Sequence, residues 1–176
     1  MLVLETERLL IRDVRAGDPE GFFEYMNNEN YWRHVPVEPV TRDSVDVMVQ
    51  RALLDQGRNP RSDYFLAVLK KHSDKLVGEA ILRVLSPRWR QGEIGWGVDH
   101  RHVGNGIATE IGFAMLHFAF QQLRLHRIFA QCRVENQASR RIMTKLGMQE
   151  EGVLRENVLA RGEWWSSVQY SILSTD

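Results

Sequence analysis

The chain has 176 residues, of which 43% are hydrophobic and 26% are charged, and this composition excludes disordered and collagen-like classes. Its 23 basic and 23 acidic side chains cancel, which argues against a general nucleic-acid coat protein. The signs are nevertheless segregated, because residues 1–50 contain ten acidic and five basic side chains whereas residues 101–145 contain two and seven. Such segregation fits either an uneven solvated surface or a pair of ligands of opposite charge.

The sequence contains no recognisable targeting signal and little that indicates a cellular compartment. A single cysteine, Cys132, cannot form an internal disulfide, which favours a reducing compartment. The N-terminus has no basic segment followed by an apolar core, and no apolar run approaches the ~20 residues that span a bilayer. Residues 1–176 contain no repeat and no linker. We therefore expect a single cytoplasmic domain without membrane contact.

The first half of the chain predicts strands and helices in alternation. Residues 8–12 have the composition of a strand, and Asp18-Pro19 provides an N-cap and a first-turn proline for a helix that continues to residue 26. Two prolines flank an aromatic loop around Tyr31 and Trp32, after which a second helix begins at Thr41 or Asp43. Three strands are then predicted, at residues 64–69, 76–84 and 93–98.

The second half predicts the central helix and the remaining strands. Residues 106–121 carry two apolar faces, so this helix should be largely buried. A strand at 127–134 alternates apolar and polar residues, and a short helix at 136–146 ends before Gly147. Two strands follow, at 152–157 and 164–173. This order predicts an α/β (α+β) fold, a mixed sheet with helices on both faces.

The most informative segment is RHVGNGIA at residues 101–108, between a strand and the most apolar helix. Gly104 and Gly106 let backbone N–H groups approach a ligand, and the helix dipole adds positive potential, so the turn is suited to a pyrophosphate. A dinucleotide-binding motif would need a third glycine, where Thr109 stands, and a P-loop would need Gly-Lys-Ser/Thr. By itself, the segment also fits a plain packing turn.

In context, the segment R-x-x-G-x-G resembles the acyl-CoA pyrophosphate motif of the GCN5-related N-acetyltransferase (GNAT) superfamily. The remaining motifs are similar to its ribosomal-protein N-terminal acetyltransferase branch, the RimJ/RimL type. They follow in order as TERLLIR (residues 6–12), EIGW (93–96), Glu110, LHRIFA (125–130), NQAS (136–139), KLGM (145–148) and GEW (162–164). The similarity covers nearly the whole chain and implies a GNAT fold with a mostly antiparallel, splayed sheet of about seven strands.

The resemblance also implies acetyl-CoA as the co-substrate and a set of residues that bind it. The backbone N–H at or near Val98 would polarise the thioester carbonyl, as an oxyanion donor does. Arg140, Arg141 and Lys145 are further candidates for the nucleotide phosphates. The predicted cofactor-binding residues are Val98, Arg101, His102, Val103, Gly104, Asn105, Gly106, Ile107, Ala108 and Asn136. No Cys/His spacing predicts a metal site.

Two residues are predicted to act in catalysis. Relatives elsewhere in the superfamily place a tyrosine after the position of Asn136, but none follows here before Trp165, so Ser139 is the available general acid for the departing thiolate. Ser139 also fits a small first-turn residue that is hydrogen-bonded to the backbone. Glu93 is the first choice for the general base, because it points to the opposite face from Ile94 and is flanked by glycines. Asp99 and His100, just beyond the strand, are the alternative bases.

The route of transfer is predicted from what surrounds Cys132. This residue faces the same side as the apolar residues of its strand, and no activating base can be placed beside it, so we expect it to be part of the core. Direct attack by the amine in a ternary complex is therefore the expected mechanism.

The acceptor is the least defined element of the site. Tyr31, Trp32 and Glu93 are the predicted substrate-binding residues, although the two aromatic residues also fit buried loop anchors. Ser166 stands where relatives commonly have aspartate, which leaves the acceptor open.

We expect an acetyl-CoA-dependent N-acetyltransferase acting on a primary amine, first of all a protein N-terminal α-amine. The alternatives are an enzyme for a small amine (an amino acid, a polyamine or an antibiotic) and a non-catalytic acyl-CoA-binding regulatory module. A dinucleotide-binding oxidoreductase is a third and weaker reading. No nucleic acid, membrane or metal is expected as a partner, and a homodimer is left open.

Overall fold

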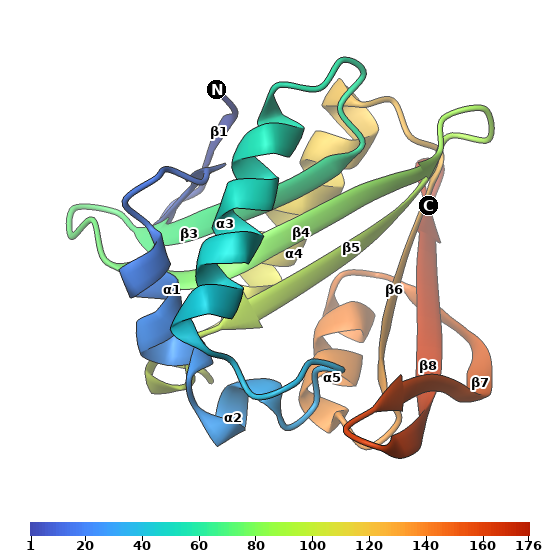
Figure 1. Ribbon diagram of the computed structural model, residues 1–176. Coiled ribbons are helices and arrows are strands. Elements are labelled where there is room, and N and C mark those ends of the chain that lie inside the picture. Colours follow the sequence, from blue (N-terminus) through green and yellow to red (C-terminus); the bar gives the residue numbers. More distant parts are fainter.

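One eight-stranded sheet organises the chain, and the computed structural model describes all of its residues, 1–176 (Figure 1). The strands lie in the order β1-β2-β3-β4-β5-β6-β8-β7, and every neighbouring pair is antiparallel except β5 and β6. The strands are β1 (Val3–Glu5), β2 (Leu9–Asp13), β3 (Asp63–Lys70), β4 (Leu76–Ser86), β5 (Gln91–Val98), β6 (Arg127–Arg133), β7 (Gln149–Ala160) and β8 (Glu163–Leu173). This confirms the predicted fold class, with β1 as an additional strand.

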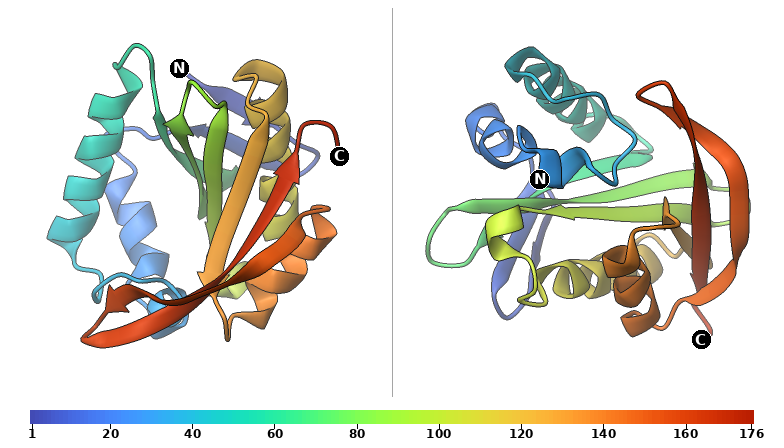
Figure 2. Two further views of the ribbon diagram at one scale, coloured as in Figure 1. Left: turned by 90° about the vertical axis from the view of Figure 1, so that its right-hand side faces the viewer. Right: turned by 90° about the horizontal axis from the view of Figure 1, so that it is seen from below.

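Helices cover both faces of the sheet (Figure 2). On one face lie α1 (Pro19–Met26), α2 (Glu29–Trp32) and α3 (Arg42–Gln56), and on the other lie α4 (Ile107–His117) and α5 (Gln137–Lys145). A 3-10 turn, η1 (His100–His102), precedes α4, and a π-helical turn, η2 (Phe118–Gln122), extends it. None of these helices combines the length and apolarity needed to cross a membrane.

Each face of the sheet has its own hydrophobic core. The larger core lies beneath α4 and α5 and includes Ile111, Met115 and Met143, each fully buried. The smaller core joins α1 and α3 to the sheet through residues such as Phe22 and Val49. Burial of one such side chain contributes roughly 1.5–3 kcal/mol, so the two cores hold the helices firmly against the sheet.

Side-chain capping explains the start of α3 and the start of α2, a helix that the sequence did not predict. At the start of α1, Asp18 makes no side-chain capping bond and pairs with Arg12 instead. Thr41 and Ser44 form a reciprocal capping box at the start of α3, as expected from Thr41. Tyr31 and Trp32 lie in the short helix α2 and not in a loop, because the Asn28 side chain accepts a hydrogen bond from the N–H of Asn30 and starts a helical turn.

The feature that shapes the site is a splay between β5 and β6. Their parallel pairing extends only from Gln91–Glu93 to Arg127–Phe129, after which β5 continues beside β4 and β6 continues beside β8. Beyond Glu93, one edge of β5 therefore has no partner strand, and Figure 1 shows the two strands diverging toward α5. An unpaired strand edge offers backbone donors and acceptors to an extended ligand.

Candidate functional site

The open edge of β5 ends at Val98. The N–H of the next residue, Asp99, donates to the Val77 carbonyl oxygen of β4 at 2.9 Å. Because successive N–H groups of a strand point to opposite edges, the N–H of Val98 points away from β4 and toward the splay. This is the position at which the sequence predicted a donor for a carbonyl oxygen.

The turn before α4 has the geometry of an anion cradle. Gly104 and Gly106 have φ values of +81° and +77°, in the left-handed region that residues with a side chain rarely adopt. Gly106 is the N-cap of α4, so the first N–H groups of this helix have no intrahelical acceptor. The space around the missing Gly104 side chain is empty to 4 Å. Backbone donors and the helix dipole are therefore both accessible to an anion.

A cavity of about 740 Å³ adjoins this cradle, and it brings together residues from three parts of the chain. Gly106 at the start of α4, Lys145 at the end of α5 and Arg8 beside β2 all line it. The Arg8 guanidinium donates to the Asn105 carbonyl oxygen at 2.8 Å and to Glu110 at 2.7 Å, and so ties the cradle to the N-terminal strands. Because Glu110 holds Arg8, Lys145 and the free helix N–H groups are what this cavity offers to a phosphorylated ligand.

Two predicted phosphate ligands point elsewhere. The Arg101 guanidinium donates to Asp99, with a shortest distance of 2.6 Å, and to Glu24 of α1, also at 2.6 Å. Arg140 pairs with Glu150 of β7 at 3.1 Å. Both side chains are held by carboxylates, so the cradle consists chiefly of backbone groups.

The remaining residues of the predicted cofactor segment differ in exposure. Val103 is exposed, and His102 keeps a buried Nε2 atom without a hydrogen-bond partner. Ile107 is buried and packs into the larger core, so its side chain anchors the start of α4. Asn105 immediately precedes Gly106, and Ala108 lies in the first turn of α4.

The start of α5 carries the predicted acid. The Asn136 side chain caps this helix by accepting a hydrogen bond from the N–H of Ser139 at 3.1 Å. Ser139 is partly exposed, and its hydroxyl has no hydrogen-bond partner within the protein. The hydroxyl is therefore free to donate to a ligand.

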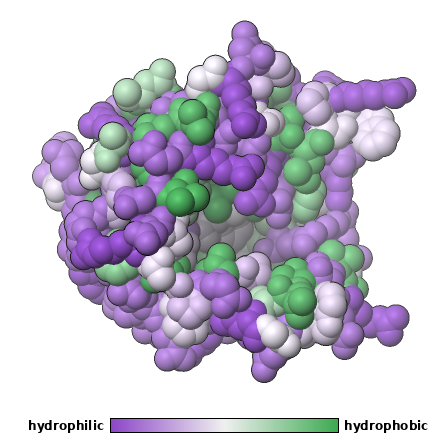
Figure 3. All heavy atoms as spheres, viewed as in Figure 1, coloured by the Kyte–Doolittle hydropathy of each residue, from purple (hydrophilic) through white to green (hydrophobic).

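On the face of α1, α2 and α3, the molecule is hollowed beside the splay (Figure 3). Glu93, Gly95 and Gly97 of β5 point to this face. They pair with Arg83, Ile81 and Glu79 of β4, and the Glu79 side chain contacts α1 and α2. The two glycines leave the surface of the strand bare. Glu93 lies at the vertex of the splay and pairs with Arg83 at 3.5 Å.

The aromatic residues predicted to bind substrate occupy different positions. Tyr31 donates its hydroxyl hydrogen to the Glu79 carboxylate at 2.7 Å, so its hydroxyl hydrogen is already used within the protein. The Trp32 ring lies 5.5 Å from the Arg161 guanidinium carbon, and Arg161 donates to the Val37 carbonyl oxygen at 2.6 Å. Arg161 thus joins the turn between β7 and β8 to the segment after α2, with Trp32 at the junction.

Sequence reasoning missed Glu79 and Tyr25. Glu79 of β4 is only 3% exposed and accepts hydrogen bonds from the hydroxyls of Tyr25 and Tyr31. Burial raises the pKa of Glu79, and the two hydroxyls act in the opposite direction. Burial and the Glu79 charge raise the pKa of Tyr25 well above its usual value. A glutamate within an otherwise apolar strand was the signal that could have identified this cluster.

Two other titratable residues lie beside the site. Burial raises the pKa of Asp99, but hydrogen bonds from the Arg101 side chain and backbone outweigh it and leave the pKa below the usual value, which makes Asp99 a weak base. Burial raises the pKa of the Cys132 thiol to about 11, so this thiol is protonated at neutral pH. Cys132 packs against the larger core, as predicted.

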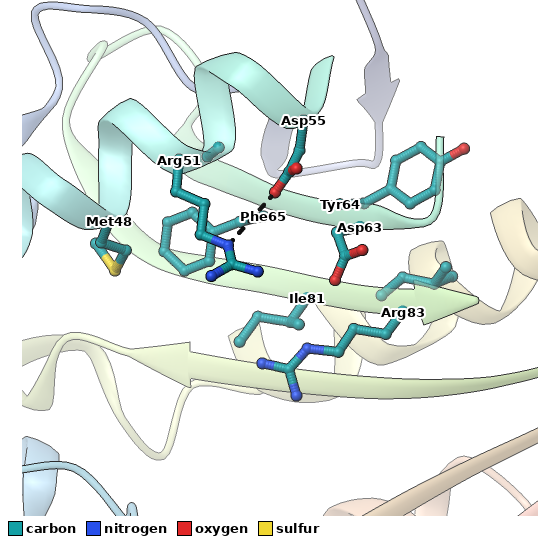
Figure 4. A pocket seen from close by; sticks show the side chains of 10 residues that line it. Met48, Arg51, Asp55, Asp63, Tyr64, Phe65, Ile81 and Arg83 are labelled. Carbon is teal, nitrogen blue, oxygen red and sulfur yellow. Dashed lines mark ion pairs between the residues drawn. The ribbon is translucent and has the colours of Figure 1, made fainter. Parts of the chain in front are cut away.

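A second pocket, of about 150 Å³, lies between α3 and strands β3 and β4 (Figure 4). Arg51 and Asp55 of α3 face each other across one turn of the helix at 3.9 Å, and Arg83 of β4 also lines the pocket. It contains no nucleophile beside a base and no free helix N-terminus. No group of three or more His, Cys, Asp or Glu side chains has the arrangement of a metal site.

Comparison with known proteins identifies the family. Residues 8–149 match the model of the acetyltransferase (GNAT) domain. The uncharacterized N-acetyltransferase YnaD of Bacillus subtilis is 29% identical over 98% of both chains. The uS5 ribosomal-protein alanine N-acetyltransferase of Escherichia coli is 21% identical over 98% of this chain and 91% of its own.

Solved structures agree with this result. A GNAT-family acetyltransferase from Bacillus anthracis has 28% identity and a TM-score of 0.87, and the match covers 99% of this chain and all of the other. The ribosomal L7/L12 acetyltransferase RimL, solved in complex with coenzyme A, has the same fold, with a TM-score of 0.85, at 17% identity over 99% of this chain and all of its own. The splayed sheet, the glycine turn and the family match together lead to one conclusion: the chain belongs to the GNAT family of acetyltransferases.

Proposed function

We propose that this enzyme transfers an acetyl group from acetyl-CoA to a primary amine, first of all a protein N-terminal α-amine, by direct attack in a ternary complex. The single observation that carries the proposal is the continuity of the open β5 edge with the anion cradle at Gly104 and Gly106. An extended arm with a pyrophosphate at one end and a thioester at the other fits both features at once.

The residues present fit acetyl-CoA in three places. When bound, acetyl-CoA supplies a thioester carbonyl carbon for attack. The N–H of Val98 is available to a developing oxyanion, and the cradle and Lys145 are available to phosphates. Ser139, with its free hydroxyl, is proposed to donate a proton to the leaving thiolate.

The relatives support a protein N-terminus as acceptor. The proteins named for acetylation of ribosomal proteins share the fold over nearly the full chain. A free α-amine has a pKa near ~8, so a useful neutral fraction is present at neutral pH and a single carboxylate suffices as base. Ser166 of β8 accepts a hydrogen bond from the N–H of Glu156 at 3.0 Å and so holds the bulge of β7.

A thiol-release assay tests the proposal. Acetyl-CoA is supplied with peptides that have free N-terminal alanine or serine, the same peptides with blocked N-termini, and a set of amino acids, polyamines and aminoglycosides. We expect turnover with free N-termini and none with blocked ones. Turnover confined to small amines would reassign the acceptor class. Binding of coenzyme A by calorimetry, without turnover of any amine, would instead identify a non-catalytic acyl-CoA-binding module.

Ser139 and Cys132 provide a paired prediction. Ser139→Ala should lower kcat roughly 100-fold, because the thiolate loses its proton donor, whereas KM for acetyl-CoA should change little. Cys132→Ala should leave kcat within about twofold of the wild-type value, since a protonated thiol takes no part in direct transfer. Steady-state kinetics measure both. An inactive Cys132→Ala variant that still folds and binds coenzyme A would contradict direct attack.

A further inference from the structure

Glu79 is a buried carboxylate without a cationic partner. It is 3% exposed and forms no ion pair, although buried carboxylates are normally paired with a cation. Its two hydrogen-bond donors are the hydroxyls of Tyr25 on α1 and Tyr31 on α2. Two helices therefore position one carboxylate, and the missing counterion is a positive charge that the protein itself does not supply.

The carboxylate lies directly over β5 at the end of its open edge. Glu79 is paired with Gly97, and a Cβ atom built on Gly97 would lie 2.1 Å from Oε1 and 2.6 Å from Oε2. Gly97 precedes Val98, whose N–H points into the splay, and consecutive Cα atoms are about 3.8 Å apart. Gly97 is itself partly exposed, so solvent reaches the strand beside the carboxylate.

We propose that Glu79, held by Tyr25 and Tyr31, binds the amino group of the acceptor and receives its proton. This inference rests on the proposed function and names the residue that performs one step of it. The acceptor is a primary amine that arrives as an ammonium ion on the face of α1 and α2. It supplies the positive charge that this carboxylate lacks.

In the transfer step one bond forms and one bond breaks. The amine nitrogen forms a bond to the carbonyl carbon and the carbon–sulfur bond breaks. The ammonium nitrogen loses two protons: one moves to Glu79 before attack, and the second leaves as the amide forms and replaces the hydroxyl proton that Ser139 gives to the thiolate. The two tyrosines remain protonated because their pKa values lie well above the usual range, so they continue to donate to the carboxylate. A carboxyl group with a raised pKa is also a better match to an amine as proton acceptor.

The other two candidate carboxylates are less well placed. Glu93 lies four residues before Gly97 on the same strand, about 13 Å away, and it pairs with Arg83. Asp99 is held by the Arg101 guanidinium through three hydrogen bonds. Only Glu79 combines proximity to Val98 with a site for an external cation.

Glu79→Gln tests the inference, since glutamine has nearly the same shape and keeps an oxygen that can accept from a tyrosine. We expect kcat/KM for the amine to fall at least about 100-fold, with KM for acetyl-CoA unchanged. The acid limb of the pH–rate profile, which reports titration of Glu79 among Tyr25, Tyr31 and Asp99, should disappear. Glu79→Asp should recover part of the activity. Asp55→Asn, at a buried carboxylate of α3, is the matched control and should keep full activity.

The outcomes separate this inference from the proposed function. A Glu79→Gln variant with the wild-type kcat/KM and pH profile would overturn the inference, and turnover by the wild-type enzyme would still support the proposed function. Loss of that limb in Glu93→Gln but not in Glu79→Gln would assign the proton to Glu93 and would also overturn it. A wild-type enzyme that turns over no amine would overturn both.

Discussion

Gly97→Ala should lower kcat/KM for the amine at least about 100-fold, whereas Gly95→Ala should be tolerated. Both glycines lie on the same face of β5, so the two substitutions are chemically identical and two residues apart. At Gly97 the new methyl group would lie 2.1 Å from the Glu79 carboxylate and must displace it. At Gly95 the nearest atom is Ile81 Cβ at 3.7 Å, an ordinary contact. Small displacements of a reacting group cost on the order of 100-fold in rate.

Steady-state kinetics and thermal unfolding measure this difference. The overpacked Gly97→Ala variant should also lose about 1–3 kcal/mol of stability, so assays belong well below its unfolding temperature. Equal activity of the two folded variants would show that the Glu79 carboxylate does not need its place over β5.

Gly104→Ala should weaken the binding of coenzyme A at least about tenfold, or about 1.4 kcal/mol. Alanine is strained at φ +81°, by about 1–2 kcal/mol, and its methyl group would project into the space that is open to an anion. Calorimetric titration of the free enzyme with coenzyme A measures the change.

Gly162→Ala is the matched control for that prediction. Gly162 has φ +76°, has no atom within 4 Å of its missing side chain, and lies in the turn between β7 and β8. It should therefore carry the same backbone strain and the same loss of stability, with unchanged affinity for coenzyme A. If both variants bound coenzyme A equally well, the glycine turn would be a packing feature and not a phosphate cradle.

The distribution of charge shows what the sequence can predict about the charged residues of the site and what it cannot. The basic segment 101–145 contributes Lys145 to the cavity beside the cradle, as expected for an anionic ligand. Its Arg101, however, pairs with Asp99 and with Glu24 of the acidic first segment. Arg8, also from the acidic segment, lines the same cavity as Lys145. Net charge by segment predicts the presence of opposite charges but not which of them remain free.

Local physics made the scaffold readable from the sequence. Gly104 and Gly106 require backbone conformations that few other residues adopt, Thr41 and Asn136 cap helices with their own side chains, and alternation along β5 assigns Glu93 and the two glycines to one face. Each of these properties depends on neighbours within a few residues. The fold class, the family and the position of the glycine turn could therefore be predicted from short segments.

What the sequence alone determined is thus the scaffold and the position of the glycine turn for which we propose phosphate binding. The tertiary structure decided which carboxylate lies beside the end of β5. Glu79, Tyr25 and Tyr31 are separated by up to 54 residues, and only the packing of α1 and α2 on β4 brings their oxygen atoms together. The burial that raises the pKa of Glu79 and the guanidinium that occupies Asp99 likewise arise from contacts across elements. Hydrogen bonding and desolvation depend on distances in space, and the number of residues between two positions does not determine those distances.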